Sequence, residues 1–325
     1  MRAEPTVEII VGRLRRLVPQ GTPLEASFPS SRWRPGVWVR ALRLEHWVKN
    51  TLVFVAPVLG LQIAAPMVLG QSILLFLLMG LLASATYLVN DAVDLEADRQ
   101  HPRKRLRPMA AGMITICNGL TVAAGLIVFS LTLSLVLPLA CTVTLLVYLA
   151  VTLAYSFVLK RKPIVDVFVL AGLFTVRIVA GGWLISGLIS PWLLTFSMMF
   201  FLGLAVVKRY AELERVVRTG GEGVTSRGYT SNDLPLLLAT GVGSGLGAVV
   251  IFTMYLINDH YPRAIYKSPE ALWVMMPVLL LWTLRTWHIT VHGRMNEDPV
   301  VFALKDRASL FLGAFIIMTL ITAWL

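Results

Sequence analysis

The chain has 325 residues, of which 57% are hydrophobic and only 14% are charged, and its mean hydropathy is +0.74. This composition excludes an ordinary soluble domain and predicts a polytopic membrane protein. The formal net charge is +11, and the basic residues lie mainly in loops between apolar runs rather than in a nucleic-acid-binding motif. Neither the two cysteines nor the five histidines have the spacing of a metal site.

Residues 1–44 form a polar, Arg-rich N-terminal segment that contains five prolines and no signal-peptide core. Within it, Val7–Val18 is consistent either with a short helix on an anionic membrane surface or with a disordered tail. We assign residues 1–44 to a cytoplasmic segment and residues 45–325 to a transmembrane catalytic domain.

Apolar runs of membrane-spanning length predict an all-α bundle of about nine transmembrane helices. With the N-terminus in the cytoplasm, 26 of the 29 lysines and arginines fall on the cytoplasmic side, as the positive-inside rule requires, and the C-terminus lies outside. The predicted spans are residues 46–66, 71–91, 114–134, 137–158, 164–186, 191–211, 236–257, 270–290 and 303–324.

The first predicted span begins with R-L-E-H-W-V-K-N, which places Trp47, Lys49 and Asn50 at the membrane interface. One interpretation is that Trp47 lies at the membrane interface and the ammonium of Lys49 reaches the lipid headgroups. A phosphate-binding role for Lys49 and Asn50 is the alternative.

Acidic residues precede basic ones in the stretch from Asn90 to Gly112, where the second predicted span ends. If the helix continues to Asp98, the three carboxylates of Asp91, Asp94 and Asp98 lie within about 60° of one another along about 10 Å of one face. Clustered carboxylates favour a divalent cation, and at a phosphate-handling site hard oxygen ligands favour Mg²⁺. The alternative is a solvated helix end whose acids pair with the basic residues downstream.

The pattern N-D-x-x-D-x-x-x-D followed by K-R-x-R-P-x-A-A-G resembles the first aspartate-rich motif of the UbiA superfamily of intramembrane prenyltransferases. Further segments resemble its decaprenyl-phosphate phosphoribosyltransferase branch, including the W-V-K-N of residues 47–50. The resemblance covers the chain from about Arg40 onward. It implies a UbiA-like bundle whose active-site cavity opens to the cytoplasm, with Asp91, Asp94 and Asp98 as metal ligands. It also favours substrate-binding roles for Lys49, Asn50, Asn90, Lys104, Arg105 and Arg107.

Around the fifth predicted span, Tyr155 and Lys160 come before Asp166, which shares a helix face with Arg177 about 16 Å away along the axis. An arginine inside an apolar span is costly and faces a cavity or a partner. Pairing with a buried acid would satisfy Arg177. Bidentate binding of a phosphate is the interpretation that we favour. Gly181 and Gly182 predict close helix packing.

The sixth predicted span ends in K-R-Y-A-E, with Lys208, Arg209, Tyr210 and Glu212. Lys208 and Glu212 are spaced as an i, i+4 surface pair. UbiA enzymes with prenyl diphosphate donors typically carry a second acidic motif here, whereas the phosphoribosyltransferases resemble this chain. A substrate with a phosphate besides its metal-bound diphosphate would need these cations.

Two further segments resemble the phosphoribosyltransferases. The loop of residues 218–235, which contains Tyr229, would act either as a lid over the substrate or as a flexible connection. Near the last span, Pro299 fits a first-turn helix position. The charges of Lys305, Asp306 and Arg307 would either pair with one another or serve the site, with the cations on a phosphate and Asp306 on the base or the metal.

These features predict a Mg²⁺-dependent pentosyltransferase in the inner (plasma) membrane. It would move 5-phosphoribosyl from phosphoribosyl diphosphate (PRPP) to a polyprenyl phosphate, for cell-envelope pentose precursors. Arg177 and Lys208 join the three aspartates as the expected catalytic residues. The alternatives are a UbiA prenyltransferase acting on an aromatic or other acceptor and a non-enzymatic carrier of anionic lipids. Membrane lipids are expected partners, nucleic acid is not, and homo-oligomerisation stays open.

Overall fold

The computed structural model describes residues 35–100, 104–185, 189–221, 223–224, 227–260, 266–295 and 298–325, without the side chains of residues 259 and 260. The predicted surface helix Val7–Val18 lies outside these residues. The chain forms two compact units. Unit 1 comprises the described residues up to Val48 together with Met79–Leu133, and unit 2 comprises Lys49–Leu78 and the described residues from Ser134 to Leu325. The division into residues 1–44 and 45–325 stays a prediction.

Unit 1 is built around the second half of a long helix, α4. Its core joins Val37 and Ala41 of α2, Ala85 and Leu88 of α4, and Ala123 of α6. Since α4 ends in the predicted aspartate motif, this core fixes the backbone that carries the motif. The elements are α2 (Pro35–Leu42), the start of η1 (Leu44–Phe54), the end of α4 (Pro66–Val93), α5 (Leu95–Gln100), η2 (Lys104–Leu106) and α6 (Ile116–Ser134).

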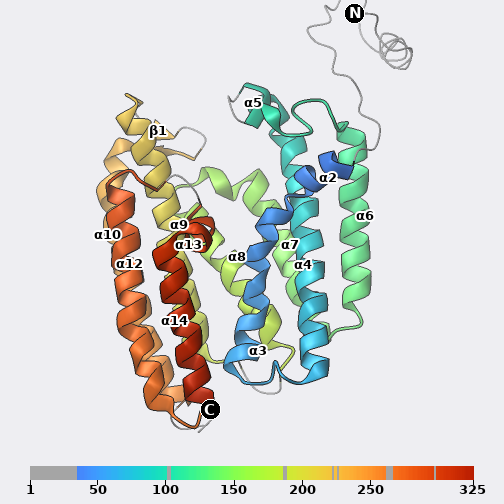
Figure 1. Ribbon diagram of the computed structural model, residues 1–325. Coiled ribbons are helices and arrows are strands. Elements are labelled where there is room, and N and C mark those ends of the chain that lie inside the picture. The colour runs from blue at the N-terminus through green and yellow to red at the C-terminus, as the bar shows by residue number, and fades with distance from the viewer. Residues whose placement is uncertain are drawn as a thin grey trace, which may run out of the picture. The chain divides into compact units, whose positions relative to one another are not determined.

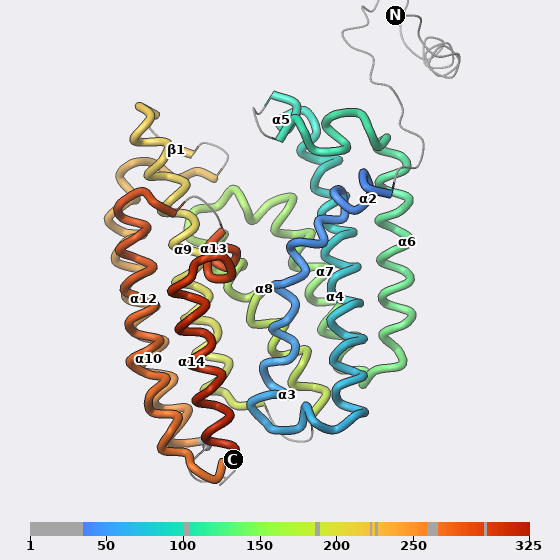
Figure 2. Tube along the Cα trace, in the orientation of Figure 1, coloured from blue at the N-terminus to red at the C-terminus, as the bar shows by residue number. Residues whose placement is uncertain are grey.

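Unit 2 is a helical bundle in which α9 is central, since α8, α10, α12 and α13 all contact it. The helices α9, α10, α12 and α14 stand side by side in yellow to red (Figures 1 and 2). Its elements are α3 (Val55–Leu59), α7 (Leu139–Phe157), η3 (Leu159–Arg161), α8 (Val165–Gly182), α9 (Pro191–Arg218), β1 (Gly223–Val224), β2 (Tyr229–Thr230), η4 (Ser231–Asp233), α10 (Leu234–Tyr255), η5 (Leu256–His260), η6 (Pro269–Val274), α12 (Met275–Val291), α13 (Pro299–Lys305) and α14 (Arg307–Trp324).

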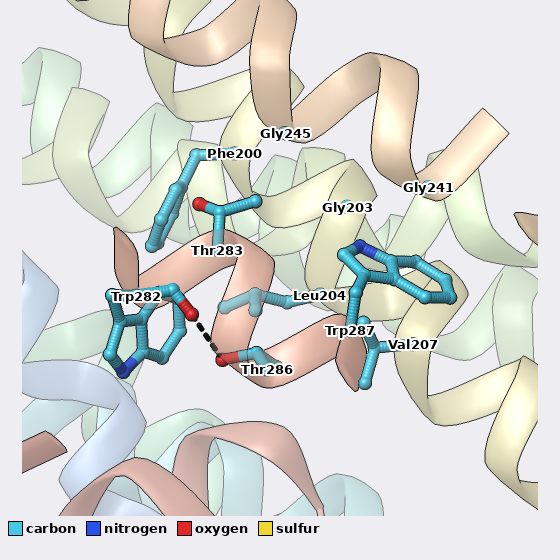
Figure 3. Close-up of a pocket in the computed structure, with 10 residues that line it drawn as sticks. All are labelled: Phe200, Gly203, Leu204, Val207, Gly241, Gly245, Trp282, Thr283, Thr286 and Trp287. Atoms are coloured by element: carbon cyan, nitrogen blue, oxygen red, sulfur yellow. Dashed lines mark hydrogen bonds between the residues drawn. The ribbon is translucent and has the colours of Figure 1, made fainter. Parts of the chain in front are cut away.

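Glycines let the helices of unit 2 approach closely. A Cβ at Gly241 would lie 2.0 Å from Cζ2 of Trp287, and one at Gly245 would lie 2.5 Å from Cγ2 of Thr283. Figure 3 shows these residues around a void of about 10 Å³, room for about one water molecule. A Cβ at Gly181 would meet the Val53 carbonyl oxygen at 1.9 Å, which confirms the predicted close packing there.

Eight helices among the described residues are long and apolar enough to cross a membrane, and they correspond to the last eight predicted spans. The first predicted span instead contains the eleven-residue 3₁₀ helix η1 and the short α3. Pro57 lies within α3, and Leu61 has a positive φ of 53°, so one long α-helix cannot form there. The predicted count of nine therefore stays a prediction.

The helix α9 runs eleven residues beyond Val207, well past its apolar part. No proline or glycine interrupts the chain before Gly220, and Glu214 and Arg218 form an i, i+4 ion pair at 2.6 Å. The charged residues from Lys208 to Arg218 therefore lie on a continuation of the same helix, which is still packed against its neighbours at Arg209 and Leu213.

Candidate active site

The predicted aspartate motif forms a compact cluster in unit 1. The helix α4 ends at Val93, and α5 starts at Leu95 after a one-residue break. The backbone bonds from Asp94 N to Asn90 O and from Asp98 N to Asp94 O keep the helical path, so Asp91 and Asp98 face the same side two turns apart. Both carboxylates are almost fully buried, at 3% and 2% exposure.

Two arginines neutralise these carboxylates. The guanidinium of Arg107 contacts Asp98 and lies 3.3 Å from Oδ1 of Asp91, and Arg43 forms an ion pair with Asp91. Arg43 has a positive φ of 51°, where α2 turns into η1, and its guanidinium lies 4.8 Å from the ring centre of Tyr87. We call Asp91, Asp98, Arg43 and Arg107 the aspartate cluster.

The other residues predicted around this motif lie at its edge. Lys104 and Arg105 are exposed on η2, and Nζ of Lys104 is 4.0 Å from Oδ1 of Asp98. Oδ1 of Asn90 is buried and accepts no hydrogen bond. Asp94 is half-buried at the break between α4 and α5.

The aspartate cluster has suitable donors for Mg²⁺. Two buried carboxylates meet at Arg107, and the Asn90 oxygen is a further hard ligand atom. Mg²⁺ typically takes only one or two carboxylates from a protein. Within the part of the chain that the structure describes, no three His, Cys, Asp or Glu side chains converge as a metal site. A direct metal bond from all three aspartates therefore stays a prediction.

In unit 2, two lysines converge on one acid. Nζ of Lys49, on η1, and Nζ of Lys208, on α9, each lie 2.9 Å from Oδ2 of Asp298. Oδ1 of Asp298 accepts a hydrogen bond from the backbone of Val300 and caps α13, which begins at Pro299 as predicted. Burial alone would raise the pKa of Asp298, but the ammonium groups of Lys208 and Lys49 hold it well below its usual range. We call these three residues the lysine cluster.

Arg177 is buried at 7% exposure and binds neutral groups. Its Nε donates to Oδ1 of Asn50 at 2.9 Å, its Nη2 donates to the hydroxyl of Tyr148 at 3.0 Å, and its Nη1 donates to the Leu173 carbonyl. Among the described residues, no carboxylate forms an ion pair with Arg177, so pairing with a buried acid is not observed. Nδ2 of Asn50 is also buried without an acceptor. A guanidinium and an amide donor are therefore available to an anion.

Arg209, next to Lys208, has different partners. Its Nε lies 2.7 Å from Oδ2 of Asp166, and its Nη1 contacts Glu212. The hydroxyl of Tyr229 donates to Oδ1 of Asp166 at 2.6 Å and accepts from the backbone N–H of Ile164 at 2.8 Å. Burial and the bond to Asp166 raise the pKa of Tyr229 well above its usual range. We call Asp166, Arg209, Glu212 and Tyr229 the tyrosine network.

The tyrosine network attaches the hairpin β1–β2 to the turn between α7 and α8. Ile164 has a positive φ of 66° in this turn, a strained conformation for a β-branched residue. Nη1 of Arg227 donates to the hydroxyl of Tyr155 at 3.0 Å and to the Lys160 carbonyl at 3.4 Å. The described part of the predicted loop is therefore anchored at both Arg227 and Tyr229, although its role as a lid stays a prediction.

The remaining predicted residues have mainly packing or capping contacts. Asp306 binds Arg285 through both carboxylate oxygens, at 2.6 and 3.0 Å, and caps α14 by accepting from Ser309 N. Lys305 and Arg307 are exposed beside it. The Tyr210 ring packs edge-on against Trp287. Lys208 pairs with Asp298, so the suggested Lys208–Glu212 surface pair is not observed.

The sequence did not point to two residues of these clusters, Arg43 and Asp298, nor to Tyr148, which accepts a hydrogen bond from Arg177. Arg43 begins the quoted segment R-L-E-H-W-V-K-N, and Asp298 directly precedes Pro299, so the available signal was their place beside residues already named. Tyr148 lies in an apolar span without any local signal.

A family model, the UbiA prenyltransferase family, matches residues 52–311. This chain belongs to that family. Uncharacterized protein y4nM of Sinorhizobium fredii is 38% identical over 286 residues, 88% of this chain, and the chain spans 55% of that protein's length. The decaprenyl-phosphate phosphoribosyltransferase of Mycolicibacterium smegmatis is 32% identical over 279 residues, which cover 83% of this chain and 86% of that protein.

The solved structure of a UbiA homolog from Archaeoglobus fulgidus bound to DMAPP and Mg²⁺ has a TM-score of 0.67 and 16% identity to this chain. The match covers 88% of this chain and 98% of that one. This likeness confirms the predicted UbiA fold.

Proposed function

We propose that this UbiA family member is a Mg²⁺-dependent transferase that moves 5-phosphoribosyl from PRPP to a polyprenyl phosphate. The products are polyprenylphosphoryl-5-phosphoribose and diphosphate. The observation that carries the proposal is the convergence of Lys49 and Lys208 on one carboxylate oxygen. Prenyl diphosphate users are expected to have a second acid pair near the end of α9, whereas this chain has cations there. The named relative from Mycolicibacterium smegmatis supports the same reaction.

In unit 1, the aspartate cluster would hold the diphosphate end of PRPP. Asp91, Asp98 and the oxygen of Asn90 are the ligands that the donor chemistry favours for the metal. Bound Mg²⁺ would neutralise part of the charge on the departing diphosphate. Arg43 and Arg107 would position the two carboxylates.

In unit 2, the lysine cluster would hold a substrate phosphate. Two ammonium groups within hydrogen-bond reach of one oxygen suit a phosphate, which offers several acceptor atoms and up to two negative charges. Arg177 and Asn50 supply donors for a further phosphate oxygen. Since Arg177 is buried among neutral groups, an anion there would gain from the low local dielectric.

The reaction is a substitution at C1 of the ribose. An oxygen of the lipid phosphate forms a bond to C1, and the bond from C1 to the diphosphate oxygen breaks, with its electron pair leaving on diphosphate. Since the attacking phosphate is already ionised near neutral pH, no strong general base is needed. The protein's contribution is to orient the two substrates and stabilise the developing charge.

An apolar cavity in unit 2 suits the polyprenyl tail. It measures about 200 Å³, and Leu61, Ile317, Leu320 and Trp324 are among its lining residues. The lining combines the segment after α3 with the end of α14. Such a surface would bind isoprenoid units through burial of apolar area.

The test is transfer of radiolabel from PRPP to a butanol-extractable lipid by the purified chain, with Mg²⁺ and decaprenyl phosphate. We expect labelled lipid that disappears with EDTA and with Asp91→Asn. Glu96→Gln is the matched control, because Glu96 is an exposed acid in the same motif. No label, together with consumption of a prenyl diphosphate when aromatic acceptors are supplied, would overturn the proposal in favour of a prenyltransferase.

A further inference from the structure

Asp298 lies where a substrate phosphate would have to bind. Its Oδ2 accepts from the ammonium groups of Lys49 and Lys208 at 2.9 Å each. The three residues come from distant parts of the chain, since Asp298 is 249 residues from Lys49 and 90 from Lys208. The packing of α13 against α9 helps to bring them together.

The two lysines differ in what they need from this carboxylate. Lys49 is only 14% exposed, and its ammonium lies 5.7 Å from the ring centre of Phe174, so its charge requires a nearby anion. Lys208 is 43% exposed and is also stabilised by water. Asp298 therefore supplies the anion that the buried ammonium of Lys49 requires, and a bound phosphate would supply one equally well, with Lys208 as a second donor.

We propose that Asp298 is a specificity residue that competes with ligands for Lys49 and Lys208, so that only a phosphate group, and not a carboxylate, displaces it. This inference rests on the proposed role of the two lysines as ligands of a substrate phosphate. An attached carboxylate acts at high effective concentration, so a free carboxylate of equal charge gains nothing by exchange. A phosphate brings more charge and additional acceptor oxygens, which reach both ammonium groups at once.

The cap of α13 makes the exchange feasible. Oδ1 of Asp298 accepts from Val300 N at 3.1 Å, and this bond does not involve the oxygen that the lysines share. Asp298 can therefore release both ammonium groups and remain the N-cap of α13. Asparagine is an equally good N-cap, so Asp298→Asn removes the competing charge and keeps the helix start.

The experiment measures binding of inorganic phosphate and of acetate to the full chain in detergent, by titration calorimetry. In Asp298→Asn, we expect phosphate to bind about tenfold more tightly than in the unaltered chain, because the competing state is removed. Acetate should show no measurable binding to the unaltered chain and should become a detectable ligand of Asp298→Asn. Asp233→Asn is the matched control, since Asp233 accepts from the backbone and side chain of Thr230 and should leave both affinities unchanged.

Unchanged or weaker phosphate binding in Asp298→Asn would overturn the inference. If that variant does not fold, Lys208→Gln at the half-exposed position tests the same site. It should weaken phosphate binding at least about fivefold, and unchanged phosphate affinity there would also overturn the inference. These readouts need neither PRPP nor lipid. Failure of radiolabel transfer with the expected phosphate result would therefore refute the proposed function alone.

Discussion

The aspartate cluster and the lysine cluster have opposite charge arrangements. In unit 1, the carboxylates of Asp91 and Asp98 share the guanidinium of Arg107, whereas in unit 2 the ammonium groups of Lys49 and Lys208 share the carboxylate of Asp298. The match is incomplete, because Arg43 adds a second cation to Asp91, whereas Asp298 alone faces both ammonium groups. The carboxylate oxygens of the first cluster suit a metal ion with its diphosphate, and the surplus positive charge of the second suits a phosphate.

The largest expected effect follows from removing one carboxylate of the aspartate cluster. Asp98→Asn should lower the transfer rate by on the order of 100-fold, because one of the two buried acids that face Arg107 is lost. It should also raise the Mg²⁺ concentration needed for half-maximal rate. Rates measured across a Mg²⁺ titration check this. A rate within twofold of the unaltered chain would show that the cluster is only structural.

The tyrosine network sharpens the comparison, because Arg209 contacts both of its acids and the Tyr229 hydroxyl adds a hydrogen bond to one of them, Asp166. Tyr229→Phe removes the bonds to Asp166 and to Ile164 N, so we expect unfolding to become easier by about 2 kcal/mol. Thermal unfolding in detergent measures this loss. Tyr155→Phe, which removes one hydrogen bond at a half-buried position, should cost less. Equal losses would contradict a special role for the network.

Arg177 tests whether a buried cation without an acid partner is kept for binding. Arg177→Met fills a similar space without a charge, but it leaves the Asn50 and Tyr148 oxygens without their donor, which costs about 1–3 kcal/mol of stability. We expect the folded variant to transfer label at least about tenfold more slowly. An unchanged rate per folded molecule would instead assign Arg177 to folding.

The smallest expected effect concerns Asp306, whose carboxylate pairs with one cation, Arg285, and caps α14. The hydrogen bond from Arg285 lowers the pKa of Asp306 to about 2. A lowered folded-state pKa gives stability that is present above the unfolded value near 3.8 and is lost as the pH falls toward 2. Since the pair is partly exposed, the gain is below about 1 kcal/mol. Unfolding of the unaltered chain and of Asp306→Asn should differ at pH 6 and converge near pH 2, and a constant difference would contradict this.

Hydropathy and charge predicted most of the bundle because a long apolar run has few alternatives in a membrane. They did not predict η1, because the mixed apolar and polar sequence of Leu44–Phe54 contains no signal that distinguishes a 3₁₀ helix from an α-helix. The aspartate motif could be located because its residues are adjacent in sequence. The contact of Asp298 with Lys49 spans 249 residues, and only the packing of the folded chain brings the two together.

Residue pairing also could not be inferred from composition. Lys208 and Arg209 are neighbours and both basic, yet Lys208 contacts Asp298 and Arg209 contacts Asp166. Successive helical residues point about 100° apart, so adjacent cations on α9 meet different neighbours. A sequence pattern therefore places a charge at a site but does not choose its partner.

The 3₁₀ helix η1 has a consequence for how its segment can change in evolution. Three residues make one turn of such a helix, and Asn50, Val53 and Ala56 are buried at that interval along η1 and α3. Inserting or deleting one residue before Asn50 would rotate these side chains by about 120°. Insertions and deletions in this segment should therefore be tolerated only in multiples of three residues, which keep the same side chains on the buried face.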